Sequence, residues 1–145
     1  MPYGLLYGHR VYLAAAFPWR EEPANYRLDR MSELRVSDSV GTRPRDFDLD
    51  SYAARSFGVF QEEPHDVVLH FLPEVTEEVA AFQFHPSQTI TREADGSTTA
   101  RFRAGGLREM AWHLFTWGDV VTIIAPPALK RTMLELLECA RSSML

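Results

Sequence analysis

The sequence contains one cysteine, one lysine and no long apolar run, and these shortages exclude several classes of protein. Cys139 is the single cysteine, so neither an internal disulfide nor a cysteine-based zinc site can form. No stretch approaches the roughly 20 apolar residues that a membrane-spanning helix needs. No signal-peptide pattern opens the chain. We therefore expect a cytoplasmic protein with no membrane partner.

The charge is negative overall but unevenly distributed. The 15 basic residues, of which Lys130 is the only lysine, are outnumbered by 20 acidic residues, giving a formal net charge of −5. The protein as a whole is therefore not a polyanion binder. Residues 1–45, however, contain seven arginines and five acids, which permits a local anion site there. Arginine suits bidentate phosphate contacts, although the bias of a GC-rich genome explains the same usage more simply.

The first part of the chain is predicted to be rich in β-structure. The 145 residues, 46% of them hydrophobic, fit one ordinary domain or two very small ones with a packed core. Short apolar runs separated by turn-forming residues predict strands and no helix. The strands are expected at residues 3–7, 10–16, 25–28 and 33–37, with turns at Gly8-His9 and between Pro18 and Pro23.

A linker is predicted next, over residues 41–64, because glycine, proline and charged residues are frequent there. Within it, Asp48 and Asp50 are suited to cap a short helix. This helix is expected to continue through Ser56 and to be ended by Gly58.

From Asp66 onward, strands alternate with amphipathic helices. The strand signals lie at residues 66–72, 87–94, 97–104 and 119–125, and Asp95-Gly96 predicts a hairpin between the middle two. Apolar residues recur at helical spacing on three stripes. These are Val75, Val79 and Phe82; Leu107, Met110, Ala111, Leu114 and Phe115, before Gly118; and Leu129, Met133, Leu136, Leu137 and Ala140, after Pro126-Pro127. The order β-α-β-β-α-β-α predicts an α+β, ferredoxin-like domain with an extra C-terminal helix.

Several motifs, taken in order, resemble one family over nearly the full chain. RVYLAAA (10–16) followed by NYRLDRMSEL (25–34) resembles the WYL domain, named for a Trp-Tyr-Leu triplet on one strand. DFDLDSYAARSFGVF (46–60) resembles the connector in these proteins. FQFHPSQTI (82–90) and the segment of residues 94–137 resemble their C-terminal extension, often called WCX.

The resemblance implies part of a bacterial transcriptional regulator. In that family a winged helix-turn-helix binds DNA, and the WYL domain, a small Sm- or SH3-like β-barrel, is thought to sense a nucleotide or nucleic-acid ligand. The extension mediates dimer contacts and regulation. Here no helix-turn-helix and no early barrel strands are found, so we expect a truncated regulator or a remnant completed by another chain. Duplex DNA would be bound only through the missing helix-turn-helix. The expected parts are a partial WYL domain (1–40), the linker (41–64) and a WCX domain (65–145).

Two residues depart from the family pattern. The triplet reads Val11-Tyr12-Leu13, so its tryptophan is replaced. The family often has an arginine three residues before the position of Arg27, where this chain has Ala24. Both departures remove groups that would contribute to ligand affinity.

Tyr12, Arg27 and Arg30 are the first candidates for a ligand site. If residues 10–16 pair with residues 24–30, a subset of these side chains shares one face. A tyrosine ring beside guanidinium forks suits a nucleotide or a single strand, through stacking plus charge. Strict alternation, however, places Arg27 and Arg30 on opposite faces unless the strand ends at Asp29. The alternative is that Arg30 only pairs with Asp29 or Glu33 on a solvated hairpin.

The secondary candidates for the same site are Arg10, Trp19 and Arg20. Trp19 offers a stacking platform, but a tryptophan beside Pro18 more often packs over a hydrophobic edge. The segment His85-Pro86-Ser87-Gln88 is interpreted as a structural turn or interface element. We expect no metal, because the histidines lack metal-ligand spacing. We also expect no cofactor and no enzymatic activity, because no paired carboxylates or Ser-His-Asp constellation is recognisable.

The leading hypothesis is a ligand-sensing regulatory module that forms a homodimer. Its ligand would be a nucleotide or a single-stranded nucleic acid. The alternative hypothesis is an oligomerisation or protein-interaction fragment that binds no ligand.

Overall fold

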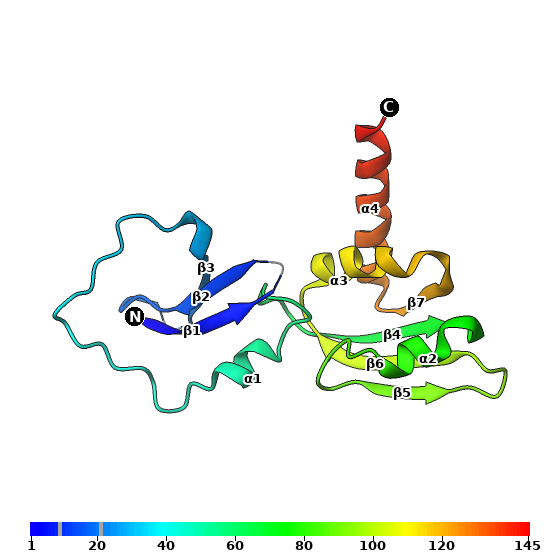
Figure 1. The fold of residues 1–145 in the computed structure, drawn as a ribbon, viewed down its shortest axis with the longest axis horizontal. Helices are drawn as coiled ribbons and strands as arrows, with labels where there is room; N and C mark the ends of the chain where they lie inside the picture. The colour runs from blue at the N-terminus through cyan, green and yellow to red at the C-terminus, as the bar shows by residue number, and fades with distance from the viewer. Residues whose placement is uncertain (9, 21) are drawn as a thin grey trace. The chain divides into compact units, whose positions relative to one another are not determined.

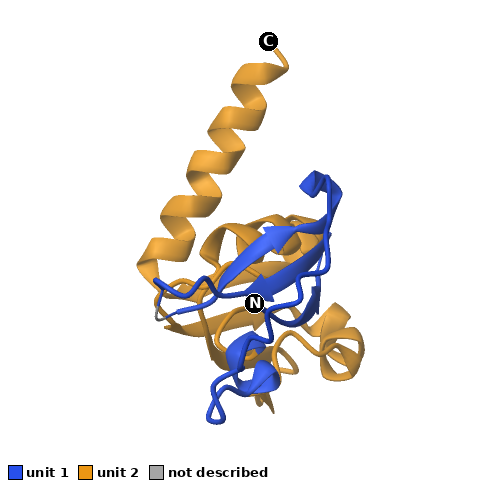
Figure 2. Ribbon diagram, turned by 90° about the vertical axis from the view of Figure 1, so that its left-hand side faces the viewer, with its two compact units in different colours: residues 1–53 blue, residues 54–145 orange. Residues whose placement is uncertain are grey.

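The computed structural model describes residues 1–8, 10–20 and 22–145. It divides the chain into two compact units, Met1–Ala53 and Ala54–Leu145 (Figure 2). Together the described residues form two antiparallel sheets and four α-helices, which confirms the α+β prediction. The residues predicted to form the linker are divided between the two units.

The first unit contains a three-stranded antiparallel sheet in the order β1-β2-β3 (Figure 1). Its strands are β1 (Pro2–Tyr7), β2 (Val11–Ala15) and β3 (Ala24–Arg27), so the first three predicted strands are confirmed. His9 of the first predicted turn, and Glu21 within the second, lie outside the described residues.

One face of this sheet is covered by the short helix α1 (Leu49–Ala53). Leu49 packs against Gly4, and a Cβ at that position would require the Leu49 side chain to shift. The buried Tyr52 donates a hydrogen bond from its hydroxyl to Oδ1 of Asn25 at 3.2 Å. The buried apolar residues of the unit are Leu6, Tyr12, Ala14, Ala15, Ala16 and Tyr52.

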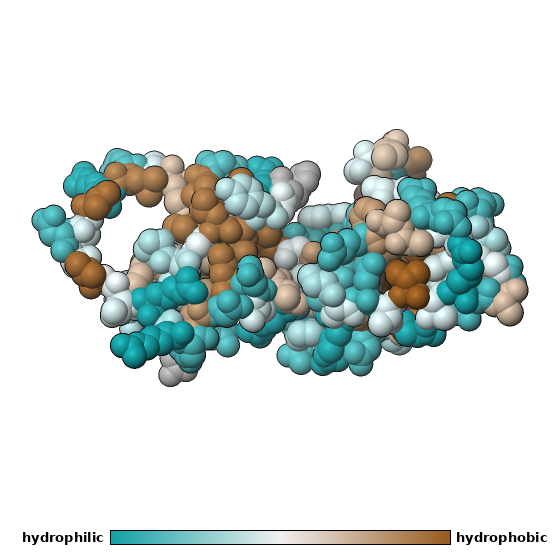
Figure 3. All heavy atoms as spheres, turned by 60° about the horizontal axis from the view of Figure 1, so that its bottom comes forward, coloured by the Kyte–Doolittle hydropathy of each residue, from teal (hydrophilic) through white to brown (hydrophobic). Residues whose placement is uncertain are grey.

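The opposite face carries Leu5, Leu13 and Tyr26, which lie directly across from one another in the strand register. Leu5 is 41% exposed, and Leu13 and Tyr26 are only partly buried. Phe17 meets Tyr26 edge-on, with ring centroids 5.8 Å apart. Figure 3 shows hydrophobic side chains gathered over the region of β1–β3. This sheet therefore buries one face and leaves much of the other face uncovered within its own unit.

Two predictions for the first unit and its boundary are wrong. Residues 33–37 form no strand, because Glu33 has a φ of 53°, which interrupts an extended backbone, and Val36 is fully exposed. Asp48 does cap the short helix, accepting the Ser51 N–H at 2.6 Å. The helix ends at Ala53 rather than Ser56, because Ser56 instead forms a β-bridge with Gly105.

The second unit contains a four-stranded antiparallel sheet in the order β5-β6-β4-β7. The strands are β4 (His65–Phe71), β5 (Thr89–Arg92), β6 (Thr98–Ala104) and β7 (Val121–Ala125), all near their predicted positions. On the central strand β4, alternate residues Val67, Leu69 and Phe71 are fully buried.

Helices follow the strands as predicted, with shorter bounds. The turn η2 (Pro73–Val75) leads into α2 (Thr76–Ala81), and α3 (Leu107–Leu114) precedes the 3₁₀ segment η3 (Phe115–Val120). The regular helix therefore ends before Gly118, whose φ of 62° is left-handed. Val79, Met110, Ala111 and Leu114 join the strand residues in one hydrophobic core.

The last helix, α4 (Pro127–Ser143), buries only the first part of its predicted apolar stripe. Leu129 is fully buried, and Met133 and Leu136 are partly buried. Leu137 is 47% exposed and Ala140 is exposed, so the C-terminal part of the stripe is not covered by this unit.

The predicted hairpin turn at Asp95-Gly96 is confirmed. Oδ1 of Asp95 accepts hydrogen bonds from the Ser97 N–H at 2.9 Å and from its hydroxyl. Gly96 has a φ of 88°, which favours glycine because it has no Cβ. This turn joins β5 to β6, the two strands at one side of the sheet.

Candidate functional site

Tyr12 and Arg27 are direct neighbours across strands β2 and β3. The register pairs Tyr12 with Arg27, Leu13 with Tyr26 and Ala15 with Ala24. Tyr12 is 7% exposed, whereas the Arg27 side chain is 25% exposed. The predicted pairing of these two segments is therefore confirmed, with the tyrosine in the core of the unit and the guanidinium at its surface.

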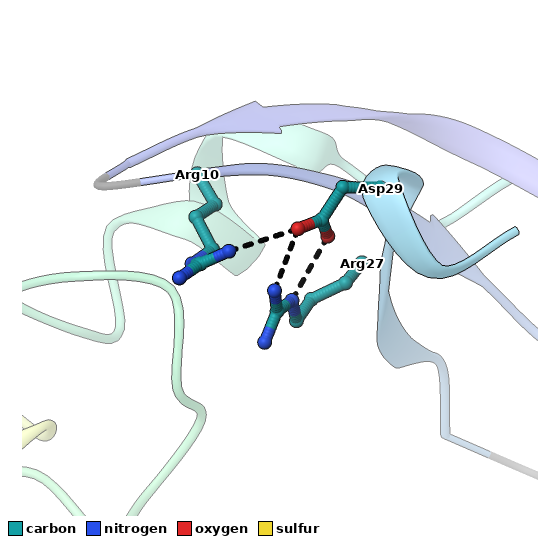
Figure 4. Close-up of polar contacts among 3 residues, drawn as sticks. All are labelled: Arg10, Arg27 and Asp29. Carbon is teal, nitrogen blue, oxygen red and sulfur yellow. Dashed lines mark hydrogen bonds and ion pairs between the residues drawn. The ribbon is translucent and has the colours of Figure 1, made fainter.

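Asp29 links Arg27 to Arg10 (Figure 4). Nε and Nη2 of Arg27 donate to Oδ1 and Oδ2 of Asp29 at 2.9 and 2.6 Å, which is a bidentate contact. Nη1 of Arg10 donates to the same Oδ2 at 2.8 Å. One carboxylate thus holds two guanidiniums that are 17 residues apart in the chain. We call these three residues the Asp29 cluster.

The electrostatics of the Asp29 cluster favour the ionised forms. The hydrogen bond from Arg27, followed by that from Arg10, holds the pKa of Asp29 well below its usual range. The same hydrogen bond raises the pKa of Arg27. Asp29 and Arg27 therefore remain charged at neutral pH. With two arginines and one aspartate, the cluster carries one formal net positive charge.

Arg30 lies close to the cluster in the chain but takes no part in it. Strand β3 ends at Arg27, and Leu28–Arg30 form a 3₁₀ turn, so strand alternation does not apply to Arg30. The alternative partners suggested by the sequence were Asp29 and Glu33. Within the described part of the chain Arg30 forms no ion pair with either, and its side chain is exposed.

Trp19 packs on an aromatic neighbour. Its ring stacks on Phe17, with centroids 4.7 Å apart and an interplanar angle of 13°. Trp19 nevertheless remains 77% exposed. Among the described residues, no ring contact joins Trp19 to Tyr12 or to the candidate arginines. This contact agrees with the interpretation that Trp19 packs over a hydrophobic edge.

The segment His85–Gln88 forms a hydrogen-bonded turn in the second unit. Nε2 of the buried His85 lies 2.9 Å from the carbonyl oxygen of Ala54, which can only accept, so Nε2 carries the proton. Nδ1 is then the acceptor for the Ser87 hydroxyl at 2.7 Å and the Ser87 N–H at 3.1 Å. Burial lowers the pKa of His85. These contacts agree with the interpretation of the segment as a structural turn.

A surface depression lies beside this turn. It has a volume of about 450 Å³ and is lined by residues that include His85, Ser87, Arg55 and Arg103. Arg103 donates to Oδ1 of Asp66 at 2.9 Å. Arg55 and Arg103 are not among the candidates expected from the sequence, because the loop before β4 and the strand β6 are far apart in the chain.

The described residues contain no group of three or more His, Cys, Asp or Glu side chains that could hold a metal ion. None of the helices in the described chain has both the length and the apolar character to cross a membrane.

Comparison with family models agrees with this two-unit architecture. The model of the WCX domain matches residues 63–140, which is more than half of the chain, and the model of the WYL domain matches residues 1–36. The chain therefore belongs to the WCX domain family and combines this domain with part of a WYL domain. The pair of domains points to a regulatory module of WYL-type transcriptional regulators. A search of curated proteins finds no match to the chain.

Asp29 is the residue of this site whose partners differ from the expectation. The sequence suggests Arg30 as its partner, whereas Asp29 binds Arg27 and Arg10. The spacing Arg-x-Asp at the end of a strand is the available signal, because a turn directly after the strand brings the two side chains together.

Proposed function

We propose that this chain is the ligand-sensing and dimerising module of a bacterial WYL-type regulator. Its ligand would be a nucleotide or a single-stranded nucleic acid, bound through a phosphate at Arg10, Arg27 and Arg30. The single observation that carries the proposal is the bidentate contact between Arg27 and Asp29. It supports an anion site, because phosphate uses the same guanidinium donors as a carboxylate.

The two aromatic candidates of the proposed site differ in how accessible their rings are to a base. Tyr12 is buried, so its ring has little free face for a base, although it lies directly opposite Arg27. Trp19 is the exposed aromatic candidate of this unit. We therefore assign the main contribution to phosphate contacts and a supporting one to base stacking.

We also infer the finer topology of each unit. In the second unit, β4 and β6 are central, whereas β5 and β7 form the edges of an antiparallel sheet. With the element order β-α-β-β-α-β, this supports a ferredoxin-like fold. The antiparallel β1-β2-β3 sheet supports part of an Sm- or SH3-like barrel, with the uncovered face around Leu5, Leu13 and Tyr26 as the interior side.

The proposed homodimer is supported by the exposed apolar face of α4. Leu134 is 65% exposed and Leu137 is 47% exposed. Together with Met133, Val121 and Ile123, they line a depression of about 360 Å³ beside β7. A self-complementary contact of two such faces would bury these side chains around a twofold axis.

The experiment for ligand binding is isothermal titration calorimetry. The chain is titrated with short single-stranded oligonucleotides and with cyclic and linear nucleotides. Arg27→Ala is expected to weaken binding by about tenfold or more, because it removes charge-assisted hydrogen bonds to the phosphate. Arg30→Ala tests whether the exposed guanidinium of Arg30 contributes to the same site.

Arg35→Ala is the matched control, because it removes the same charge from an exposed arginine of the same unit. It should change the affinity only slightly. Equal affinities of wild-type protein and Arg27→Ala would remove the Asp29 cluster from the ligand site.

The alternative function, an interaction fragment without a ligand, is favoured by a specific observation. Asp29 already satisfies Arg10 and Arg27, which leaves fewer free donors for an incoming anion. The uncovered apolar face of the first sheet also suits contact with another chain. Concentration-dependent self-association, with no heat from any of the tested ligands, would select this alternative.

A further inference from the structure

We propose that Asp29 is an internal competitor for the ligand phosphate, and that binding requires its carboxylate to leave Arg27. This inference rests on the function proposed above and adds a means of controlling its affinity. It concerns a residue that was not among the predicted ligand contacts. Its physical basis is that a carboxylate and a phosphate oxygen need the same guanidinium donors.

The Asp29 carboxylate occupies the edge of the Arg27 guanidinium formed by Nε and Nη2. Both carboxylate oxygens of Asp29 are engaged, one by Nε and the other by Nη2 of Arg27. Oδ2 also accepts from Nη1 of Arg10. A phosphate approaching the same edge of Arg27 would meet a negative oxygen at each of the two donor positions (Figure 4).

Asp29 can be displaced at low energetic cost because the cluster is partly exposed to solvent. The side chains of Asp29 and Arg10 are 49% and 48% exposed, so water can solvate the released carboxylate. Exposed ion pairs of this kind contribute little net stability. Asp29 is also the middle residue of a single 3₁₀ turn, so a change of its side-chain rotamer moves the carboxylate without breaking a strand.

A positioning role for Asp29 would predict the opposite change in ligand affinity. If Asp29 instead held the two guanidiniums in position for the ligand, its removal would weaken binding, because the arginines would lose their orientation. The sign of the affinity change in a neutral variant therefore separates a competitor from a positioning residue.

The test uses the full chain and two defined probes, inorganic pyrophosphate and a short 5′-phosphorylated oligothymidylate. Asp29→Asn keeps the shape of the side chain and removes its charge. We expect it to tighten binding of both probes by about fivefold, as the loss of one weak competing ion pair implies. Asp29→Glu, which keeps a carboxylate within reach, should leave the affinity near that of the wild-type protein.

Glu33→Gln is the matched control for net charge, since it makes the same change four residues away at an exposed position. Its effect should be clearly smaller than that of Asp29→Asn. In the double variant Asp29→Asn/Arg27→Ala the gain should disappear, because the vacated donors are no longer present. Should Asp29→Asn fail to fold, Asp29→Ser provides the same charge change.

The outcomes distinguish the competitor role of Asp29 from the proposed ligand site itself. Tighter binding by Asp29→Asn than by Glu33→Gln supports the competitor role. If the wild-type protein binds the probes and Asp29→Asn binds them equally tightly or more weakly, the competitor role is overturned and the proposed ligand site stands. Absence of binding by the wild-type protein and by Asp29→Asn overturns both.

Discussion

His113 is held in its neutral form by its surroundings. The indole N–H of Trp117 donates to Nε2 of His113 at 3.2 Å, so this nitrogen must be unprotonated. The imidazole also contacts the rings of Phe57, Phe82 and Phe84. Burial in this aromatic cluster lowers the pKa of His113 below its ordinary value. Protonation would break the indole contact and place a charge among aromatic rings.

This arrangement predicts a stability that falls with acid. The pKa of His113 is lower in the folded than in the unfolded state, so its contribution is fully present above the unfolded value of about 6.5. It is lost as the pH falls toward the folded pKa, because the unfolded state binds the proton first. Urea denaturation at about pH 7.5 and about pH 5.5 should show the loss. His85, whose pKa is lowered in the same direction by burial, adds to it.

His113→Phe provides the comparison for this prediction. The variant removes the titrating group while keeping a ring in the aromatic cluster. The decrease in unfolding free energy between the two pH values should be smaller in the variant than in the wild-type protein. An identical decrease in both proteins would mean that His113 does not contribute to the acid sensitivity.

At the residue scale, the sequence indicates which strands lie side by side but not which side chains bind each other. The sequence predicts strands at residues 10–16 and 25–28, and a shared site is expected if they pair. They do pair, with Tyr12 opposite Arg27. The partner of Arg27 depends on where β3 ends. Because the chain turns at Leu28, Asp29 returns toward Arg27 instead of continuing along the strand.

At the scale of elements, the turn that follows α2 depends on one amide side chain. Oε1 of Gln88 accepts the N–H groups of Phe84 and His85 at 2.7 and 3.2 Å. Its Nε2 donates to the carbonyl of Phe82 at 2.9 Å. Gln88 thereby satisfies three backbone groups between α2 and β5, which have no partners in a helix or strand.

Gln88→Ala should therefore destabilise the protein by about 1–3 kcal/mol, the cost of leaving the partly buried N–H groups of Phe84 and His85 without a hydrogen-bond partner. The free energy of unfolding in urea measures this effect. Gln83→Ala is the matched control, because Gln83 is an exposed glutamine in the same loop. Its unfolding free energy should stay within about 0.5 kcal/mol of the wild-type value. Similar losses in both variants would contradict the specific role of Gln88.

Elements were predicted most reliably where a strong periodic pattern coincided with a tertiary role. The strand containing Val67, Leu69 and Phe71 is central in its sheet, and its apolar pattern was clear in the sequence. Residues 33–37 also alternate, yet they form no strand, since local pattern alone does not supply a neighbouring strand to bind. The α3 helix was predicted too long, because the 3₁₀ segment after Leu114 keeps a similar spacing of apolar residues.

At the scale of the whole molecule, the proposed dimer leads to a further prediction. Leu134→Asp should shift the protein toward the monomer, because it places a charge on the exposed apolar face of α4. Sedimentation velocity over a range of concentrations measures this shift. Because Leu134 is largely exposed in the single chain, the fold of the monomer should be retained, which circular dichroism can verify.

Glu135→Lys is the control for this variant, as it changes a neighbouring exposed residue of α4 that does not line the apolar depression. It should leave the association unchanged. If Leu134→Asp associates as strongly as the wild-type protein, the dimer contact must lie on another surface.

From the sequence alone we could predict the two-part β-rich and α+β organisation, most of the strands and the likeness to WYL and WCX domains. These features depend on local periodicity and on the order of motifs, both of which can be observed along a single chain. The structure was needed to show that Asp29 binds Arg10 and Arg27, that Tyr12 is buried and that part of α4 is uncovered. These features depend on where β3 ends and on contacts between residues far apart in sequence, which form only when the strands and helices pack.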